Sequence, residues 1–347
     1  MKKLLPFSIS LVLILSTLNS CTSKEPFLLT PDMSIIEVGK MIVLTPSITG
    51  NARWSSSDER VATVSDGIVT AVNDGHAVIT AEIDGAKGTA HIYVVQEGGT
   101  YQGEYKLIWE DDFTGSALDT TRWNIETGGG GWGNQEKQYY TARPENLRVK
   151  NGNLEIELRK EDYYSSAYTS ARINTKNKFD VAYGKIEARI NFPAGRGTWG
   201  AFWMLGYGSW PTCGEIDIVE HVGNNPTYAS HATHTREKNG TKGNNWNSGQ
   251  TVDNLEGEYH VYGVEWLRTY WLGVDAIKFY VDDQYVGSTY ASANSTFEDW
   301  PFTADRPEYI ILNLAIGGKM GGSINDDMFA QPVIMYVDWV RVHQKQF

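Results

Sequence analysis

One short strand-like run carries three acidic side chains. Residues 214 to 220 read Gly-Glu-Ile-Asp-Ile-Val-Glu, so Glu215, Asp217 and Glu220 stand among β-branched residues that favour a strand. Cleavage of a glycosidic bond needs two carboxyl groups that converge on one bond. The run is therefore the candidate catalytic segment; a calcium site and a charged edge strand are the alternative interpretations.

Strand geometry decides which of these acids can act together. Side chains on a strand alternate between faces, so Glu215 and Asp217 share one face while the isoleucine between them points into the core. Glu220 has the opposite parity. It joins the other acids only if one residue near Val219 is extruded as a β-bulge, a feature often found beside active sites. The spacing thus predicts a bulge.

The chemistry assigns complementary tasks to two converging carboxyl groups. One attacks the anomeric carbon as a carboxylate, and the other donates a proton to the leaving oxygen and later activates water. Repulsion between close carboxylates raises the pKa of one of them, which supports this division. Asp217, between the two glutamates, can hydrogen-bond to the nucleophile.

The composition restricts the fold and the partners. The 347 residues include 12 Trp, 19 Tyr and 35 Gly, and 41% are hydrophobic. Abundant aromatic residues and glycine suit β-architecture and flat apolar binding surfaces. The net charge of −12 argues against nucleic acid or an anionic membrane surface as a partner, because both require clustered basic residues. It also disfavours a heavily sulfated substrate.

The N-terminus reads as a processing segment. Lys2 and Lys3 precede an apolar run over residues 4–18 that is too short for a mature membrane span. The following Leu18-Asn19-Ser20-Cys21 resembles a lipobox, which implies a lipoprotein signal peptide over 1–20 and lipid attachment to the sulfur of Cys21. The alternative is an ordinary secretory signal. We expect an exported protein anchored in the bacterial cell envelope, at the outer membrane or cell surface.

A small β-sandwich is predicted after a tether at 21–26. Residues 27–97 contain short alternating runs at 61–64, 68–72, 77–81 and 90–95, with Asp-Gly turn signals at 66–67, 74–75 and 84–85. The stretch that begins at Trp54-Ser-Ser-Ser-Asp58 resembles the bacterial immunoglobulin-like domains of group 2. That resemblance implies a spacer or adhesive module; carbohydrate binding is the alternative role.

A Gly-rich linker at 98–104 leads into a second domain over residues 105–347. Its strand-like runs include 154–158, 184–190, 277–281, 309–314 and 335–342, and no long amphipathic helix is apparent. This pattern predicts an all-β chain, with a large antiparallel β-sandwich after the small one. The only cysteine besides Cys21 is Cys213, which we interpret as a packing residue.

The second domain resembles glycoside hydrolase family 16, in the branch similar to laminarinases. That family implies a jelly-roll sandwich of the concanavalin type. The two residues between Asp217 and Glu220 resemble the bulged branch rather than the mixed-linkage branch. The matching blocks, besides the acid run and the preceding Trp210-Pro-Thr-Cys213, lie at 128–136 with 138–141, 171–176 with 183–189, 199–206, 311–318 and 337–342.

The resemblance implies roles for individual residues. Glu215 would be the nucleophile, Asp217 its helper and Glu220 the acid/base, with no cofactor in catalysis. Arg172 has a structural ion pair as its alternative, and the tryptophans and the histidine have core packing as theirs. Substrate-binding candidates are Trp132, Asn134, Glu136, Arg172, Trp199, Trp203 and His234.

The family also implies a structural calcium ion away from the cleft. Asp112, the carbonyl of Gly152 and Asp338 match those positions, and oxygen ligands of this kind suit Ca²⁺.

The leading hypothesis is a monomeric, retaining endo-β-1,3-glucanase. The alternatives are a family 16 hydrolase of another polysaccharide (mixed-linkage β-glucan, agar or carrageenan type) and a non-catalytic β-glucan-binding protein. Retention of all three acids argues against the binding protein. Adhesion through the N-terminal domain can coexist with catalysis.

Overall fold

The structure, a computed structural model, describes residues 26–95, 105–269, 274–291, 295–296 and 298–345. The predicted signal peptide, Cys21 and the linker at 98–104 lie outside these residues. The chain divides into two units, Met1–Tyr101 and Gln102–Phe347, which we describe separately. No helix within the described ranges has the length and apolar character of a membrane span.

The first unit is built from short strands around its own apolar core. Its sheets have the orders β2-β9-β8-β5 and β3-β7-β6, with a small β1-β4 pair. Val69, Ile79 and Ile92 are fully buried in the core. All four predicted runs are strands; the immunoglobulin-like assignment stays a prediction. The strands are β1 (Leu29–Thr30), β2 (Met33–Glu37), β3 (Met41–Val43), β4 (Thr45–Pro46), β5 (Arg53–Ser56), β6 (Ala62–Ser65), β7 (Ile68–Ala71), β8 (Gly75–Ile83) and β9 (Ala86–Val95).

Two of the three Asp-Gly pairs form the expected tight turns. At 66–67 the φ angles are 49° and 80°, and at 84–85 they are 51° and 85°, which is the left-handed conformation of a type I′ hairpin. The prediction was wrong for 74–75. Gly75 begins β8, with φ of 144°, and a Cβ there would lie 2.8 Å from a methyl group of Val61. This glycine therefore permits a close approach rather than a turn.

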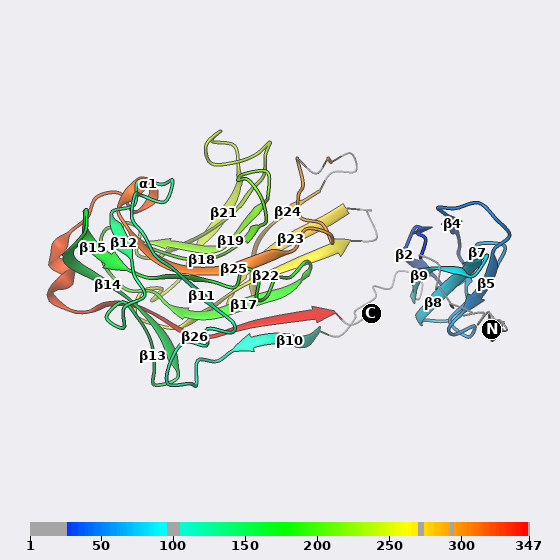
Figure 1. Ribbon diagram of the computed structural model, residues 1–347, viewed down its shortest axis with the longest axis horizontal. Coiled ribbons are helices and arrows are strands. Elements are labelled where there is room, and N and C mark those ends of the chain that lie inside the picture. The colour runs from blue at the N-terminus through cyan, green and yellow to red at the C-terminus, as the bar shows by residue number, and fades with distance from the viewer. Residues whose placement is uncertain (1–25, 96–104, 270–273, 292–294, 297, 346–347) are drawn as a thin grey trace, which may run out of the picture. The chain divides into compact units, whose positions relative to one another are not determined.

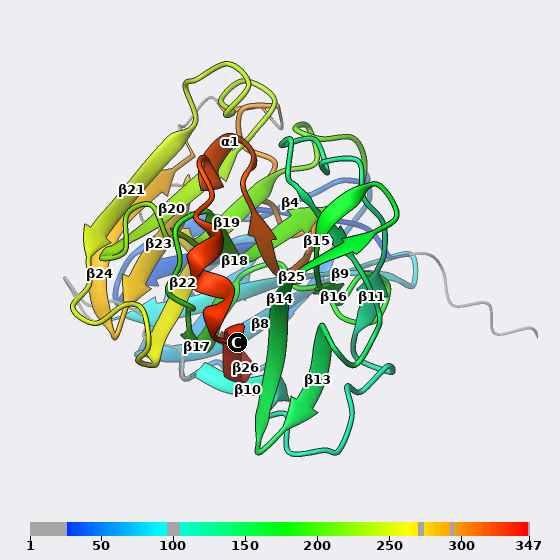
Figure 2. The same ribbon diagram turned by 90° about the vertical axis from the view of Figure 1, so that its left-hand side faces the viewer.

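The second unit stacks two large sheets. Its seven-stranded sheet has the order β11-β16-β25-β18-β19-β20-β21. Figures 1 and 2 show β18, β19 and β25 of this sheet lying over β17, β22 and β26 of the other. The strands of the seven-stranded sheet are β11 (Asn124–Glu126), β16 (Arg172–Asn174), β18 (Thr198–Gly206), β19 (Glu215–Val222), β20 (Tyr228–His234), β21 (Trp246–Thr251) and β25 (Glu308–Ile316).

The ten-stranded sheet forms the other layer. It follows the order β12-β15-β14-β26-β17-β22-β23-β24, and β10 and β13 join it at β26 and β14. Its pairs are antiparallel except for β12 with β15, which run parallel. The strands are β10 (Tyr105–Asp111), β12 (Gln138–Tyr140), β13 (Leu147–Lys150), β14 (Asn153–Tyr163), β15 (Ser166–Ser170), β17 (Gly184–Asn191), β22 (His260–Thr269), β23 (Val274–Val281), β24 (Gln284–Tyr290) and β26 (Val333–Lys345).

One continuous apolar core lies between the two sheets. Phe202, Ile216 and Leu312 from the seven-stranded sheet pack with Ile186 and Val264 from the other, and all are fully buried. Helices are short in the described chain: α1 (Gly318–Gly321) and the 3-10 turn η1 (Asp326–Ala330). The predicted all-β fold with a large sandwich is confirmed.

The register of the seven-stranded sheet groups polar residues on the face opposite the core. Along one row, Arg172 pairs with Asn313, and Ala201 pairs with both Asn313 and Glu220. In the next row Trp203 pairs with Asp217. Since this face is turned away from the other sheet, it can receive an extended ligand across the strands.

Candidate active site

The predicted bulge is present in β19. Against β18, Trp203 pairs with Asp217 and Phe202 with Val219, so Ile218 has no residue opposite it. The register of β19 against β20 also shifts, between Asp217 and Glu220. This extra residue corrects the parity of Glu220 and brings it to the face of the other two acids, as the spacing predicted.

The acids lie over a closely packed interior. Ile216, Ile218 and Val219 are fully buried beneath them, and Asp217 is 4% exposed. Because Glu215 and Asp217 are two residues apart on a strand, their side chains project to the same side, as predicted.

His234, on the neighbouring strand, reaches the acid cluster. Its Nε2 lies 3.1 Å from Asp217 Oδ2 and 3.7 Å from Glu215 Oε1. The backbone N–H of Gly240 donates to His234 Nδ1 at 3.0 Å, so the ring proton of the neutral imidazole sits on Nε2 and faces the carboxyl groups. His234 therefore stands beside the acids, and its role in substrate binding stays a prediction.

Burial controls the ionisation of all three acids. It raises the pKa of Asp217 to about 8, and with the charge of Asp217 it raises the pKa of Glu220 to about 8. Burial and the charges of Asp217 and Glu220 also raise the pKa of Glu215, and His234 opposes this shift. The cluster therefore holds fewer than three negative charges at neutral pH.

Trp199 contacts the acid/base candidate directly. Its indole Nε1 donates to Glu220 Oε1 at 3.0 Å, and the side chain is only 7% exposed. The contact fixes one carboxylate oxygen of Glu220. Trp199 thus supports the acid from the adjacent strand, and its stacking on a sugar stays a prediction.

Arg172 lies between two of the predicted binding tryptophans. Its guanidinium carbon is 4.7 Å from the ring centroid of Trp132 and 4.8 Å from that of Trp203. Glu126 Oε2 pairs with Arg172 Nε. The structural ion pair weighed against substrate binding is thus present, and it holds a cationic–aromatic stack on the sheet face.

A buried hydrogen-bond chain, missed by the sequence analysis, supports this stack. Trp203 Nε1 donates to Asn313 Oδ1 at 2.8 Å, and Asn313 Nδ2 donates to the Tyr140 hydroxyl at 3.2 Å. The Tyr140 hydroxyl in turn donates to Glu136 Oε2 at 3.0 Å. The available signal was the parity of Asn313: it alternates with the core residues Leu312 and Leu314 on β25, so its side chain lies on the face opposite the core.

Glu136 is therefore a supporting residue in the structure. It is 9% exposed, and Gln138 Nε2 donates to the same carboxylate oxygen as Tyr140. The backbone carbonyl of Asn134, the neighbouring binding candidate, accepts from the N–H of Lys319 in α1. This contact joins the glycine-rich loop at 128–136 to α1, which follows β25.

Glu308 is a further acid that the sequence analysis missed. It is 1% exposed, with the parity of the core residues Ile310 and Leu312, and its Oε2 has no hydrogen-bond partner among the described residues. Burial, with the charges of Glu215 and Asp217, raises its pKa well above the usual range. A glutamate at a core position of β25 was the available signal.

We expect Glu308→Gln to stabilise the protein as the pH rises. The folded chain keeps Glu308 protonated while the unfolded chain ionises it, so its stability contribution is present below the unfolded pKa and declines above it. Glutamine stays neutral. The difference in Tm, variant minus wild type, should be near zero at pH 4 and grow by roughly 3–5 °C per pH unit. A difference that does not vary with pH would contradict a protonated Glu308.

The candidate calcium positions converge in the ten-stranded sheet. Asp111 pairs with Val340 and Leu154 with Val337, so Asp112, Gly152 and Asp338 lie at adjoining points of the backbone. Asp338 Oδ2, however, is 2.6 Å from Arg189 Nη1. Its carboxylate is therefore already neutralised, and the calcium site stays a prediction.

The acid cluster also meets the geometric condition for a metal group. Ligand atoms of Glu215, Asp217 and His234 lie within 4.8 Å of one another, and no other such group occurs in the ranges that the structure describes. An imidazole nitrogen is a poor ligand for Ca²⁺, which takes oxygen ligands. The cluster thus does not favour the calcium interpretation of the acid run.

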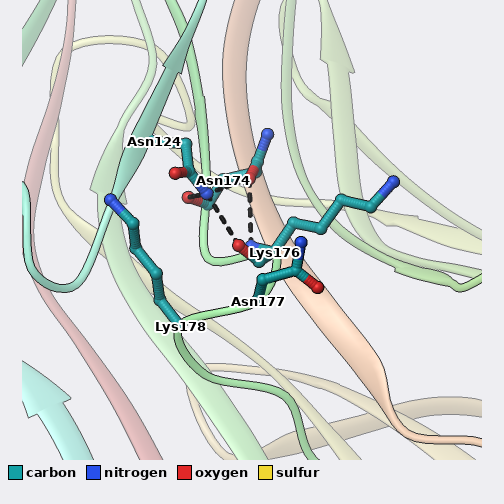
Figure 3. Close-up of a pocket in the computed structure, with 5 residues that line it drawn as sticks. All are labelled: Asn124, Asn174, Lys176, Asn177 and Lys178. Atoms are coloured by element: carbon teal, nitrogen blue, oxygen red, sulfur yellow. Dashed lines mark hydrogen bonds between the residues drawn. The ribbon is translucent and has the colours of Figure 1, made fainter.

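A hollow of about 290 Å³ lies near the end of β16. Its amides bond to one another: Asn124 Nδ2 donates to Asn174 Oδ1 at 3.0 Å. Figure 3 shows the Lys176 and Lys178 side chains extending away from each other. The hollow has no convergent chemical groups, whereas the acid cluster does.

Cys213 lies immediately before the acid run and is a free, buried thiol. Burial raises its pKa to about 11, so it stays protonated and unreactive at neutral pH. This agrees with its interpretation as a packing residue.

Comparison with known proteins finds one family over most of the second unit. A family model for glycosyl hydrolases family 16 matches residues 134–341. A β-glucanase from Rhodothermus marinus is 41% identical over 252 residues, which cover 69% of this chain and 85% of that protein.

Solved structures give the same result. The X-ray structure of the laminarinase from Rhodothermus marinus is 39% identical, with a TM-score of 0.66, and covers 71% of this chain and 100% of its own. A structure of SCLam, a non-specific endo-β-1,3(4)-glucanase, is 36% identical with a TM-score of 0.64 and covers 70% of this chain and 95% of its own. That structure presents a 1,3-β-D-cellobiosyl-glucose at its active site.

Proposed function

The chain belongs to glycosyl hydrolases family 16, and on that premise we propose that it hydrolyses β-1,3-glucan internally, with retention at the anomeric carbon. The observation that carries the proposal is the bulge, which brings Glu220 onto the face that holds Glu215 and Asp217. Without it, a single glutamate would face the ligand. The retaining reaction requires a nucleophile and a separate acid/base on one face, and the bulge supplies the second glutamate of that pair.

The surroundings of each acid support different roles. Glu220, with its pKa near 8, is protonated at neutral pH and can donate a proton to the leaving oxygen. The proton on His234 Nε2 faces Glu215 and Asp217. Asp217, also largely protonated, can donate to Glu215. Burial raises the pKa of Glu215 as well, and the charge of His234 opposes that rise, so we assign the nucleophile to Glu215 because His234 faces it rather than from its pKa.

The proposed reaction has two steps. Glu215 attacks the anomeric carbon while Glu220 gives its proton to the glycosidic oxygen, so the C–O bond to the leaving sugar breaks and a glycosyl ester forms on Glu215. Glu220, now a carboxylate, then takes a proton from water as that water attacks the same carbon. The ester breaks, and Glu215 regains its charge.

The aromatic stack can position the polysaccharide. Trp203 pairs with Asp217 across β18 and β19, so the Trp132–Arg172–Trp203 stack begins next to the acids. Indole faces suit the apolar faces of glucose rings, and the charge of Arg172 is already balanced by Glu126. The stack favours a neutral sugar chain over an anionic one.

Mixed-linkage β-glucan is the second candidate substrate. SCLam, whose structure covers 70% of this chain, is described as a non-specific endo-β-1,3(4)-glucanase. Cleavage of lichenan at a rate similar to laminarin would favour this broader specificity.

Release of reducing sugar from laminarin, lichenan and agarose tests the proposal. We expect oligosaccharide products of several lengths from laminarin and retention of the β-anomer in the first products. Activity on agarose alone would favour a galactanase instead. Binding of laminarin without hydrolysis would favour a binding protein.

We further propose that the protein is exported and anchored by a lipid on Cys21. The lipobox-like Leu18-Asn19-Ser20-Cys21 supports an exported enzyme that is held near its polymeric substrate. Expressed with its native leader in a Gram-negative host, the wild type should partition into detergent phase, and Cys21→Ala should remain in the aqueous phase. Equal partition of the two proteins would contradict the anchor.

A further inference from the structure

His231 lies at the one point of β20 that faces the bulge. The register pairs Ala232 with Asp217 and Ser230 with Glu220, so His231 alone stands opposite the two residues Ile218 and Val219. Two residues opposite one define the bulge, and His231 is the single residue on the partner strand.

The His231 side chain bonds to the extruded residue. Its Nδ1 is 2.5 Å from the carbonyl oxygen of Ile218, and the imidazole is fully buried. Because His231 alone stands opposite Ile218 and Val219, the backbone of β19 departs from the regular pairing with β20 at this point. A buried carbonyl outside the ladder needs another donor, and His231 supplies it.

The ring is held in place from its other side. Its centroid lies 5.4 Å from that of Phe279, which stacks on Trp246 at 4.9 Å. His231 Nε2 is buried with no hydrogen-bond partner among the described residues. The bond to Ile218 is thus the polar contact that the imidazole makes, and it requires the proton on Nδ1.

We propose that His231 is a positioning residue: its Nδ1–H bond to the Ile218 carbonyl holds the β-bulge and thereby aims Glu220 at the glycosidic oxygen. The inference deepens the proposed function and rests on it. His231 lies on the core side of the sheet and does not touch substrate, so its effect passes through the backbone of β19. Burial lowers the pKa of His231 to about 4, so the neutral donor persists through the neutral range.

Two substitutions separate the hydrogen bond from the volume. His231→Leu fills similar space without a donor, while the amide nitrogen of His231→Asn can take the place of Nδ1. We expect His231→Leu to lower kcat on laminarin by about 100-fold with little change in KM, because a small displacement of a catalytic group has an effect of this size. His231→Asn should recover to within about tenfold of wild type.

His221 offers a matched control for general loss of stability. It too is buried, and it bonds to the carbonyl of Tyr228 and to Glu256, each at 3.1 Å, away from the bulge. His221→Leu should lose stability comparably but lower kcat far less once rates are corrected for the folded fraction.

Azide provides a readout that a purely structural role would not change. In a 2,4-dinitrophenyl β-glucoside or β-laminaribioside, the dinitrophenolate leaves without a proton donor. With such a substrate, azide should accelerate turnover by His231→Leu and yield β-glycosyl azide. Wild type and His221→Leu should not respond. Loss of rate in His231→Leu without azide rescue, or no recovery in His231→Asn, would overturn the inference.

Failure of the proposed function gives a different result. If the wild type hydrolyses none of the glucans, the function is refuted, and hydrogen–deuterium exchange then tests the bond itself. Faster exchange of the backbone amides around Ile218 in His231→Leu than in His231→Asn would support the proposal that His231 holds the bulge. Equal exchange would overturn it.

Discussion

Glu215→Gln is expected to lower kcat on laminarin by about 10⁴- to 10⁶-fold, the range that loss of a catalytic nucleophile produces in other hydrolases. Glutamine keeps the shape and hydrogen-bonding of the side chain, but it cannot form the glycosyl ester. Laminarin binding should stay within a few-fold of wild type, because the nucleophile acts in the transition state rather than in ground-state binding. Initial rates and isothermal titration calorimetry measure the two quantities.

An exposed carboxylate elsewhere provides the control for this substitution. Glu110→Gln removes a charge from β10, which lies in the ten-stranded sheet and not in the sheet of the acids. Glu110 pairs there with Arg341 on β26, and the substitution should leave kcat unchanged. Similar activity of Glu215→Gln and wild type would remove Glu215 from the reaction.

Glu220→Gln should lower kcat on laminarin by about 10²- to 10⁴-fold, the usual contribution of a general acid–base. In the wild type, kcat/KM should fall as the pH rises past about 8, because Glu220 then loses the proton that the leaving oxygen needs. This alkaline limb should be absent in the variant. For a 2,4-dinitrophenyl β-laminaribioside the first step needs no acid, so azide should restore turnover.

The pH profile and the azide product together identify the residue. A Glu220→Gln variant whose kcat/KM on laminarin still falls past pH 8 would show that another group of the cluster, such as Asp217, sets this limb. Failure of azide to give a β-configured product would show that Glu220 is not the base of the second step.

The catalytic strand was predictable because parity is a strict consequence of strand geometry. Two residues between Asp217 and Glu220 cannot place both on one face without an extra residue, so the bulge followed from the spacing. The inward direction of Ile216 followed in the same way, whereas the position of His234 was implied by the family resemblance. What the spacing did not provide was the hydrogen bond that holds Ile218 in the bulge, since His231 is far from it in sequence.

The supporting residues were less predictable because their side-chain contacts are set by the folded structure and not by spacing along one strand. Glu136 matched a binding motif, yet Tyr140 and Gln138 engage its carboxylate in the interior. Arg172 lies between two tryptophans contributed by a loop and by β18, a contact that no local pattern encodes. Glu308 belongs to no acidic motif, and its parity on β25 places it in the core and not on the face of the other acids.

The turn at 74–75 shows a similar limit. An Asp-Gly pair indicates a hairpin when the flanking strands belong to one sheet, as at 66–67. At 74–75 the chain passes from β7 to β8, in different sheets, so the glycine serves a close approach to Val61 instead.

The most direct test is to trap the glycosyl-enzyme with 2-deoxy-2-fluoro-β-laminaribiosyl fluoride. Its 2-fluorine slows both steps, and its anomeric fluoride leaves readily in the first step, so the ester accumulates. Mass spectrometry of the proteolysed wild type should find the sugar esterified to Glu215. Added laminarin should compete for the site and make this label form much more slowly. A label on Glu220 or on any other carboxylate would contradict the assignment of the nucleophile.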